Sequence, residues 1–178
     1  MKRLCILALV ATAAPALAQR PSAAAATCAV ETSRMLWEQV AGYLSRAAEQ
    51  MPEAKYTFKP TPDVRTFGQL IAHIAGSQNL FCGTVLGEKG GSEDDIEKTM
   101  TSKADLVAAL KASNDHCRKA YAIADAAAGS KVELFGETRT SLFALMFNTT
   151  HDNEHYGNIV TYMRLQGMVP PSSQPPPR

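Results

Sequence analysis

Apolar residues recur every three or four positions through four long stretches of this 178-residue chain. This spacing places them on one face of an α-helix, so each stretch is predicted to be an amphipathic helix. The four predicted helices comprise residues 28–51, 66–86, 103–128 and 141–166. Such apolar faces are buried when helices pack against one another. The pattern therefore predicts an all-α fold, a four-helix bundle formed by residues 28–169.

Local signals mark the ends of these helices. Thr66 followed by Gln69 is a capping box, in which each side chain accepts a hydrogen bond from a free backbone N–H at the helix start. Other boundaries are marked by Pro52, Gly87, Ser102, Gly129 and Gly167. We expect an extended connector at 52–65, a long polar loop at 87–101, and an irregular segment at 130–140 with a hairpin-like turn at Gly136.

The first eighteen residues have the pattern of a secretory signal peptide. Lys2 and Arg3 precede an apolar run from Leu4 to Ala14, and a small-residue cleavage site ends at Ala18. We expect residues 19–27 to be a flexible lead-in and the Pro-rich residues 170–178 to be a disordered tail. The predicted mature protein is periplasmic or secreted.

Charge and hydropathy exclude two classes of partner. The chain has 18 Lys and Arg against 17 Asp and Glu, a net charge of +1. Loss of Lys2 and Arg3 leaves 16 against 17, a net charge of −1. No basic patch indicates nucleic-acid binding. No segment after the signal peptide reaches the roughly 20 apolar residues of a membrane span.

Three histidines are candidate metal ligands. His151 and His155 lie one turn apart on the last predicted helix, in an i, i+4 row completed by Phe143, Phe147, Ile159 and Met163. His73 shares a face of the second helix with Leu70, Ser77 and Leu80. If these two helices are antiparallel, the three rings meet at one level. Three neutral imidazoles can hold a divalent ion and leave a position for water. Hydrogen-bonded core histidines are the alternative.

The other polar residues nearby have less specific interpretations. Residues 151–155 also spell H-x-x-E-H, an inverted zinc-protease motif. No Asp or Glu follows Glu154 to serve as its third ligand, which excludes that class. Glu154 is a candidate catalytic residue that orients a ligand or relays a proton, and a surface ion pair is the alternative. We expect Asp152 to be solvated and His116 to lie on a flank or at the surface.

Three cysteines, Cys28, Cys82 and Cys117, follow the predicted signal peptide. An exported protein can keep a Cys82–Cys117 disulfide, and two buried thiols are the equal alternative. The two residues lie at similar depths in their helices. Parallel second and third helices would place them level, whereas an antiparallel pair would separate them by ~15 Å.

The segments "TFGQLIAHIAGSQ" and "HDNEHYGNIVTYMRLQGMVPPSS" resemble the second and last helices of the DinB/YfiT-like superfamily of metal-binding bundles. The resemblance extends over residues 28–173. It implies an up-down-down-up arrangement with a long crossover between the second and third helices. It also implies a divalent transition metal, zinc or nickel, on His73, His151 and His155. Asn158 stands where many members have glutamine.

This resemblance implies a metal-dependent enzyme with an unidentified small-molecule substrate. Water activation in a hydrolase-like reaction is the main hypothesis, because low-molecular-weight thiols for a transferase are chiefly cytosolic. The alternative is a non-catalytic metal or small-ligand binding module of the cell envelope. A second copy of the chain, in a homodimer, is the macromolecular partner that we leave open.

Overall fold

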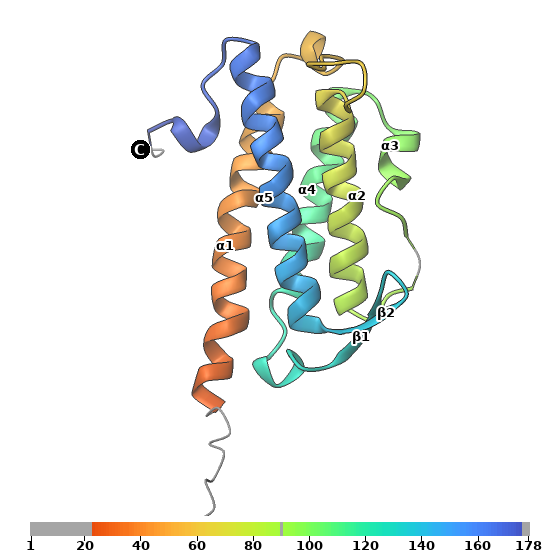
Figure 1. Ribbon diagram of the computed structural model, residues 1–178, viewed down its shortest axis with the longest axis vertical. Coiled ribbons are helices and arrows are strands. Elements are labelled where there is room, and N and C mark those ends of the chain that lie inside the picture. Colours follow the sequence, from red (N-terminus) through yellow and green to blue (C-terminus); the bar gives the residue numbers. More distant parts are fainter. Residues whose placement is uncertain (1–22, 90, 176–178) are drawn as a thin grey trace, which may run out of the picture.

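The computed structural model describes residues 23–89 and 91–175, which form a four-helix bundle with a short extra helix and a β-hairpin (Figure 1). The long helices are α1 (Ala23–Gln50), α2 (Phe67–Val85), α4 (Lys103–Ala120) and α5 (Ser141–Leu165). The smaller elements are α3 (Asp95–Thr99), β1 (Lys131–Leu134), β2 (Glu137–Thr140) and the 3₁₀ helices η1 (Glu53–Lys55), η2 (Asp125–Ala127) and η3 (Pro171–Ser173). The predicted all-α bundle is confirmed.

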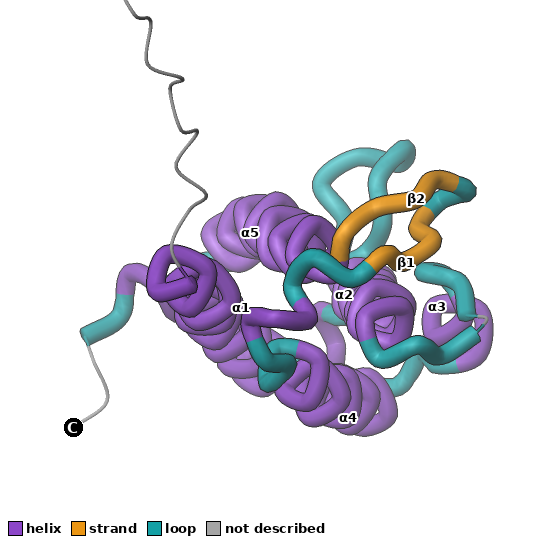
Figure 2. The backbone as a smooth tube through the Cα atoms, turned by 90° about the horizontal axis from the view of Figure 1, so that it is seen from below, coloured by secondary structure: helices purple, strands orange, loops and turns teal. Residues whose placement is uncertain are grey.

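The long helices run up, down, down and up in chain order (Figure 1). Viewed from below, each neighbours two others in the order α1, α5, α2, α4, and α3 lies beside α2 (Figure 2). The Cys82–Cys117 disulfide, one of the two alternatives that the sequence left open, is present, with 5.1 Å between the two Cα atoms. It joins the parallel helices α2 and α4 near their C-terminal ends. Helices α2 and α5 are antiparallel neighbours, as the histidine prediction required.

Helix α2 has the predicted capping at both ends, and α5 has it at its C-terminal end. The Thr66 side chain accepts a hydrogen bond from the Gln69 backbone N–H, and the Gln69 side chain accepts one from Thr66 N–H, so the predicted capping box is confirmed. Gly87 and Gly167, beyond the ends of α2 and α5, have φ values of +78° and +73°. Such left-handed backbone favours glycine, which ends both helices as predicted.

Several boundaries differ from the expectations. Helix α1 begins at Ala23, so residues 23–27 are helical, consistent with the high helix propensity of their alanines. Helix α4 ends at Ala120, eight residues before the predicted end at residue 128. The polar loop at 87–101 contains α3. The segment 130–140 forms an antiparallel hairpin that turns at Phe135 and Gly136.

The C-terminal segment is ordered as far as Pro175, so the expected disorder of residues 170–175 is wrong. Pro171 is buried, and the Ser172 backbone N–H donates to the Tyr156 hydroxyl at 2.8 Å. The side chains of Gln50 and Gln174 also form hydrogen bonds to each other. The predicted signal peptide and residues 19–22 lie outside the described part of the chain. Within the described ranges, no helix has the length and apolar character needed to cross a membrane.

The bundle interior has two main apolar clusters with a polar layer between them. The upper cluster includes Ile71, Leu110 and Ile159, and the lower one includes Trp37 and the disulfide. The layer between them consists of fully buried polar residues, which are Ser77, Gln78, Ser113, Asn148 and Asp152. These positions interrupt the apolar faces of α2, α4 and α5 at one level, where polar contacts cross the centre of the bundle.

Candidate metal centre

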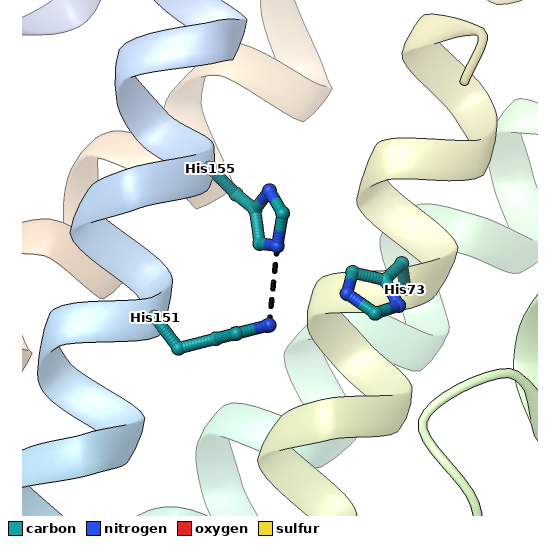
Figure 3. A group of neighbouring side chains, drawn as sticks. All are labelled: His73, His151 and His155. Carbon is teal, nitrogen blue, oxygen red and sulfur yellow. Dashed lines mark hydrogen bonds between the residues drawn. The ribbon is translucent and has the colours of Figure 1, made fainter. Parts of the chain in front are cut away.

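The structure brings the three predicted histidines together between α2 and α5 (Figure 3). His151 and His155 project from successive turns of α5, and the His73 ring faces them from α2. The Nε2 atoms of His151 and His155 are 3.1 Å apart. One ring nitrogen from each histidine lies within 4.8 Å of the others. The antiparallel pairing of α2 and α5 therefore creates the three-histidine cluster that residue spacing indicated.

The three imidazoles are held in their neutral form. Burial lowers the pKa of His73, and the positive charge of Arg65 lowers it further. Burial is also the main cause that lowers the pKa of His151 to about 3 and that of His155 to about 4. The neighbouring histidines and Arg65 add to both effects. All three rings consequently have a lone pair at neutral pH, the form that binds metals.

The second nitrogen of each ring has a different environment. Among the described residues, His73 Nδ1 is buried without a hydrogen-bond partner, and its nearest carboxylate oxygen is Asp94 Oδ1 at 3.6 Å. His151 Nδ1 is also buried without a partner. His155 Nδ1 is 3.3 Å from the Asn158 side-chain nitrogen. If His155 Nε2 binds a metal, its Nδ1 carries the proton, and the Asn158 amide must turn to present its oxygen.

These residues fit a divalent transition metal. Two ligands at 2.0–2.1 Å in a tetrahedral site are about 3.3 Å apart, close to the 3.1 Å between the two α5 nitrogens. Three imidazoles suit zinc, nickel and similar ions, and provide one ligand fewer than a closed structural zinc site.

A cavity of about 410 Å³ opens beside His155. Its wall combines the connector before α2 with one face of α5. Pro60, Thr61, Asp63, Val64, Arg65, Leu70, Asn158 and Tyr162 are the other residues that line it. The Tyr162 hydroxyl donates to the Arg65 backbone carbonyl at 2.6 Å and so fixes the connector to α5. The cluster is thus accessible to a small molecule from this side.

The opposite side of the cluster is aromatic. The Phe81 ring meets the His151 ring edge-on, with 5.4 Å between their centroids. Phe147 and Phe135 pack against Phe81, and Phe135 comes from the hairpin turn, where its φ is +54°. A non-glycine residue rarely adopts this φ. The hairpin is thereby placed against the aromatic side of the histidine cluster.

The interpretation of Asp152 as solvated is wrong. Its side chain is 0% exposed and accepts a hydrogen bond from Gln78. Asp152 lies at the centre of the buried face of α5, in line along the helix with the buried residues Leu145 and Ile159. His151 is about 100° away around the helix. Each i, i+4 step rotates the side-chain direction by about 40° around the helix axis. The predicted row therefore drifts away from the buried face, and Phe143 at its start is 42% exposed.

The other two candidates lie away from the ring nitrogens. Glu154 is exposed on α5, and its proposed role in orienting a ligand or relaying a proton stays a prediction. His116, on α4, is 3.1 Å from Glu88 and lies outside the cluster, on a flank of the bundle as expected. The sequence interpretation missed Arg65 and Asp94, which come from irregular segments. Arg65 lies in the connector before α2, and Asp94 lies in the connection after it, which folds back onto that helix.

Comparison with solved structures shows the same fold in DinB-like proteins. A DinB-like protein from Bacillus cereus superposes with a TM-score of 0.67 at 16% identity, over 79% of this chain and 95% of that chain. One from Bacillus subtilis gives 0.63 at 19% identity, over 80% and 98%. A mycothiol-dependent maleylpyruvate isomerase gives 0.60 at 17% identity, over 75% and 65%. No curated protein sequence matches significantly.

The family is established by the sequence match. A model of the DinB superfamily matches residues 36–159, which include His73, His151 and His155. This range extends from α1 into the last third of α5 and contains the cavity residues of both walls up to Asn158. The matched length exceeds half of the chain, and the solved structures agree with it in fold. The chain therefore belongs to the DinB superfamily.

Proposed function

We propose that this protein is a divalent-metal-dependent enzyme that acts on a small molecule. The observation that carries the proposal is the convergence of three neutral imidazoles, from His73, His151 and His155, beside an accessible cavity. Zinc and nickel are the ions that we expect. When bound, such an ion supplies Lewis acidity, which lowers the pKa of a coordinated water or thiol.

The cavity indicates where the substrate binds. Its volume of about 410 Å³ suits a small molecule and is too small for a folded partner. Leu70 offers an apolar contact, and Thr61, Asn158 and Arg65 offer polar ones. Asn158 adjoins His155, so a substrate that contacts this amide is held next to the metal ligands.

Two reaction classes have separate support. Hydrolysis requires only the fourth ligand position for water that three histidines leave open. Thiol-dependent transfer or isomerisation is supported by the similarity in fold to the mycothiol-dependent maleylpyruvate isomerase. Export to the periplasm or beyond, which the signal-peptide pattern suggests, favours hydrolysis. The Cys82–Cys117 disulfide supports export, because disulfides persist in oxidising compartments.

Metal analysis of protein purified without a histidine tag tests the proposal. We expect about one metal ion per chain in the wild type and in a His116→Ala control, and loss of the metal in His151→Ala. Equal metal content in His151→Ala and the control would contradict the site.

Activity assays then separate an enzyme from a binding module. Metal-loaded and metal-stripped protein should be compared on ester, amide and thiol-conjugation substrates. Metal-dependent turnover supports the enzyme, and its loss in Glu154→Gln would support the role of that carboxylate. No turnover on any substrate by fully metal-loaded protein would favour a non-catalytic binding module.

A further inference from the structure

We propose that Asp94 is a positioning residue that holds His73 in its Nδ1–H tautomer, in which the unprotonated Nε2 faces His151 and His155. The inference rests on the proposed metal site and assigns a role to a carboxylate outside the three ligands. Asp94 directly precedes α3, in the connection that folds back along α2.

The His73 ring is the starting point of the argument. Only 6% of the residue is exposed, and its Nδ1 has no hydrogen-bond partner in the part of the chain that the structure describes. A neutral imidazole binds a metal through one nitrogen only when the proton is on the other. Figure 3 shows that one ring nitrogen of His73 points toward His151 and His155 and that the other points away from them. The outer nitrogen, Nδ1, must therefore carry the proton, and a buried N–H needs an acceptor.

Asp94 is placed to be this acceptor. Its Oδ1 is 3.6 Å from His73 Nδ1, slightly beyond hydrogen-bond length, so a small shift of the ring completes the bond. Carboxylates commonly accept the second N–H of metal-binding histidines and thereby fix ring orientation and tautomer.

Arg65 holds the carboxylate in place. Its guanidinium is 3.4 Å from the same Asp94 oxygen and 3.0 Å from Glu97 Oε2. The side chains of His73, Asp94 and Glu97 also lie close enough to form a second metal site. However, the Arg65 guanidinium pairs with both carboxylates and already supplies the positive charge that a metal ion would bring. We therefore interpret this acidic group as a support for His73.

The position of the Asp94 segment depends on Gly76. A Cβ at this position would be 2.1 Å from the Glu93 carbonyl oxygen, which is far inside contact distance. Gly76 lies one helical turn after His73, and Glu93 directly precedes Asp94. The absence of a side chain at Gly76 thus allows the connection to approach α2 closely enough to bring Asp94 to His73.

The direct test is the tautomer of His73 in metal-free protein, measured by ¹⁵N NMR of the ring nitrogens at neutral pH. We expect the Nδ1–H form in the wild type and a shift toward Nε2–H in Asp94→Ala. Zinc affinity, measured with a competing chelator, should fall about 10- to 100-fold in the same variant. Asp94→Asn keeps an acceptor oxygen and should retain part of both properties.

Two controls separate positioning from charge and from packing. Asp95→Asn removes a neighbouring charge on α3, keeps an acceptor for the Ser92 N–H, and should leave the tautomer unchanged. Gly76→Ala removes no carboxylate from the chain but displaces the segment that carries Asp94, so it should reproduce the effects of Asp94→Ala. Gly157→Ala is the matched control, because a Cβ there meets no atom within 4 Å.

The outcomes distinguish the two proposals. An unchanged His73 tautomer, or an unchanged zinc affinity, in Asp94→Ala overturns the role of Asp94 and leaves the three-histidine site standing. Absence of both zinc and nickel binding by the wild type overturns the proposed function itself.

Discussion

The Gln78 side-chain amide donates a 2.8 Å hydrogen bond to the Asp152 carboxylate, where both side chains are fully buried. The Gln78 carbonyl oxygen accepts a second bond, of 2.7 Å, from the Ser113 hydroxyl. One side chain of α2 is therefore linked to both α4 and α5. Burial raises the pKa of Asp152 to about 7, although the bond from Gln78 and the nearby Trp37 indole oppose this shift.

The raised pKa predicts how Asp152→Asn changes stability with pH. The folded protein binds the Asp152 proton more tightly than the unfolded chain does, so this stabilisation is complete below about pH 4 and is lost as the pH rises through about 7. An asparagine has no charge to bury. Relative to the wild type, we expect Asp152→Asn to gain on the order of a few kcal/mol between pH 5 and pH 8.

Urea unfolding of metal-free protein at several pH values measures this difference. Asp63→Asn, in an exposed part of the connector, is the control for a general effect of charge. If the difference between Asp152→Asn and the wild type were the same at pH 5 and pH 8, the raised pKa would be wrong.

Zinc binding should persist at unusually low pH. Protons compete with the metal only below the pKa of the free ligands, and burial lowers these values to about 3 for His151 and about 4 for His155. We expect the zinc affinity to change little between pH 8 and about pH 6. Competition titrations with a chelator of known pH dependence measure it. A steep decline centred near pH 6.5 would instead indicate ordinary histidines.

The disulfide should contribute strongly to stability. It closes a segment with a sequence separation of 35, which corresponds to about 3–4 kcal/mol in the chain-entropy model. The double variant Cys82→Ser, Cys117→Ser should therefore unfold at lower denaturant concentration than the oxidised wild type. Reduced wild type is the control for the two serine hydroxyls in a buried site. Equal midpoints for oxidised and reduced protein would show that the bond contributes nothing.

The capping box at α2 should have a measurable but smaller effect. Thr66→Ala removes the acceptor for the Gln69 backbone N–H, and we expect a loss of about 1 kcal/mol in the free energy of unfolding. Thr66→Ser keeps the hydroxyl and should retain most of the wild-type stability. If the alanine and serine variants are equally stable, the hydroxyl makes no contribution.

The sequence predicted the bundle because helical periodicity and capping residues are local. The end of α4 was overestimated because residues 118–128 are rich in helix-forming alanine. In the structure, Tyr121 stacks on Trp37 with 4.6 Å between ring centroids, and its hydroxyl donates to the Leu145 carbonyl. These contacts with α1 and α5 fix Tyr121 at the C-cap. They are tertiary and override propensity.

The three histidines were found because their spacing along helices specifies direction. Asp94 carries no such spacing, since its place beside His73 depends on the path of residues 86–102, and Arg65 is found only through its contact with Asp94. Asp152 was misjudged because an isolated aspartate is usually solvated. Its partner Gln78 lies on another helix, so local pattern gave no sign of the hydrogen bond that makes its burial tolerable.

The Cys82–Cys117 bond also changes which contacts are distant along the chain. Parallel helices α2 and α4 must close the whole connection of residues 86–102 before they can pack, and such closure opposes folding entropically. Once the bond has formed, this pair is covalently adjacent even in the unfolded chain. The packing of α2 against α4, which would otherwise require the closure of a long loop, then becomes a local contact. Only the docking of α1 and α5 remains.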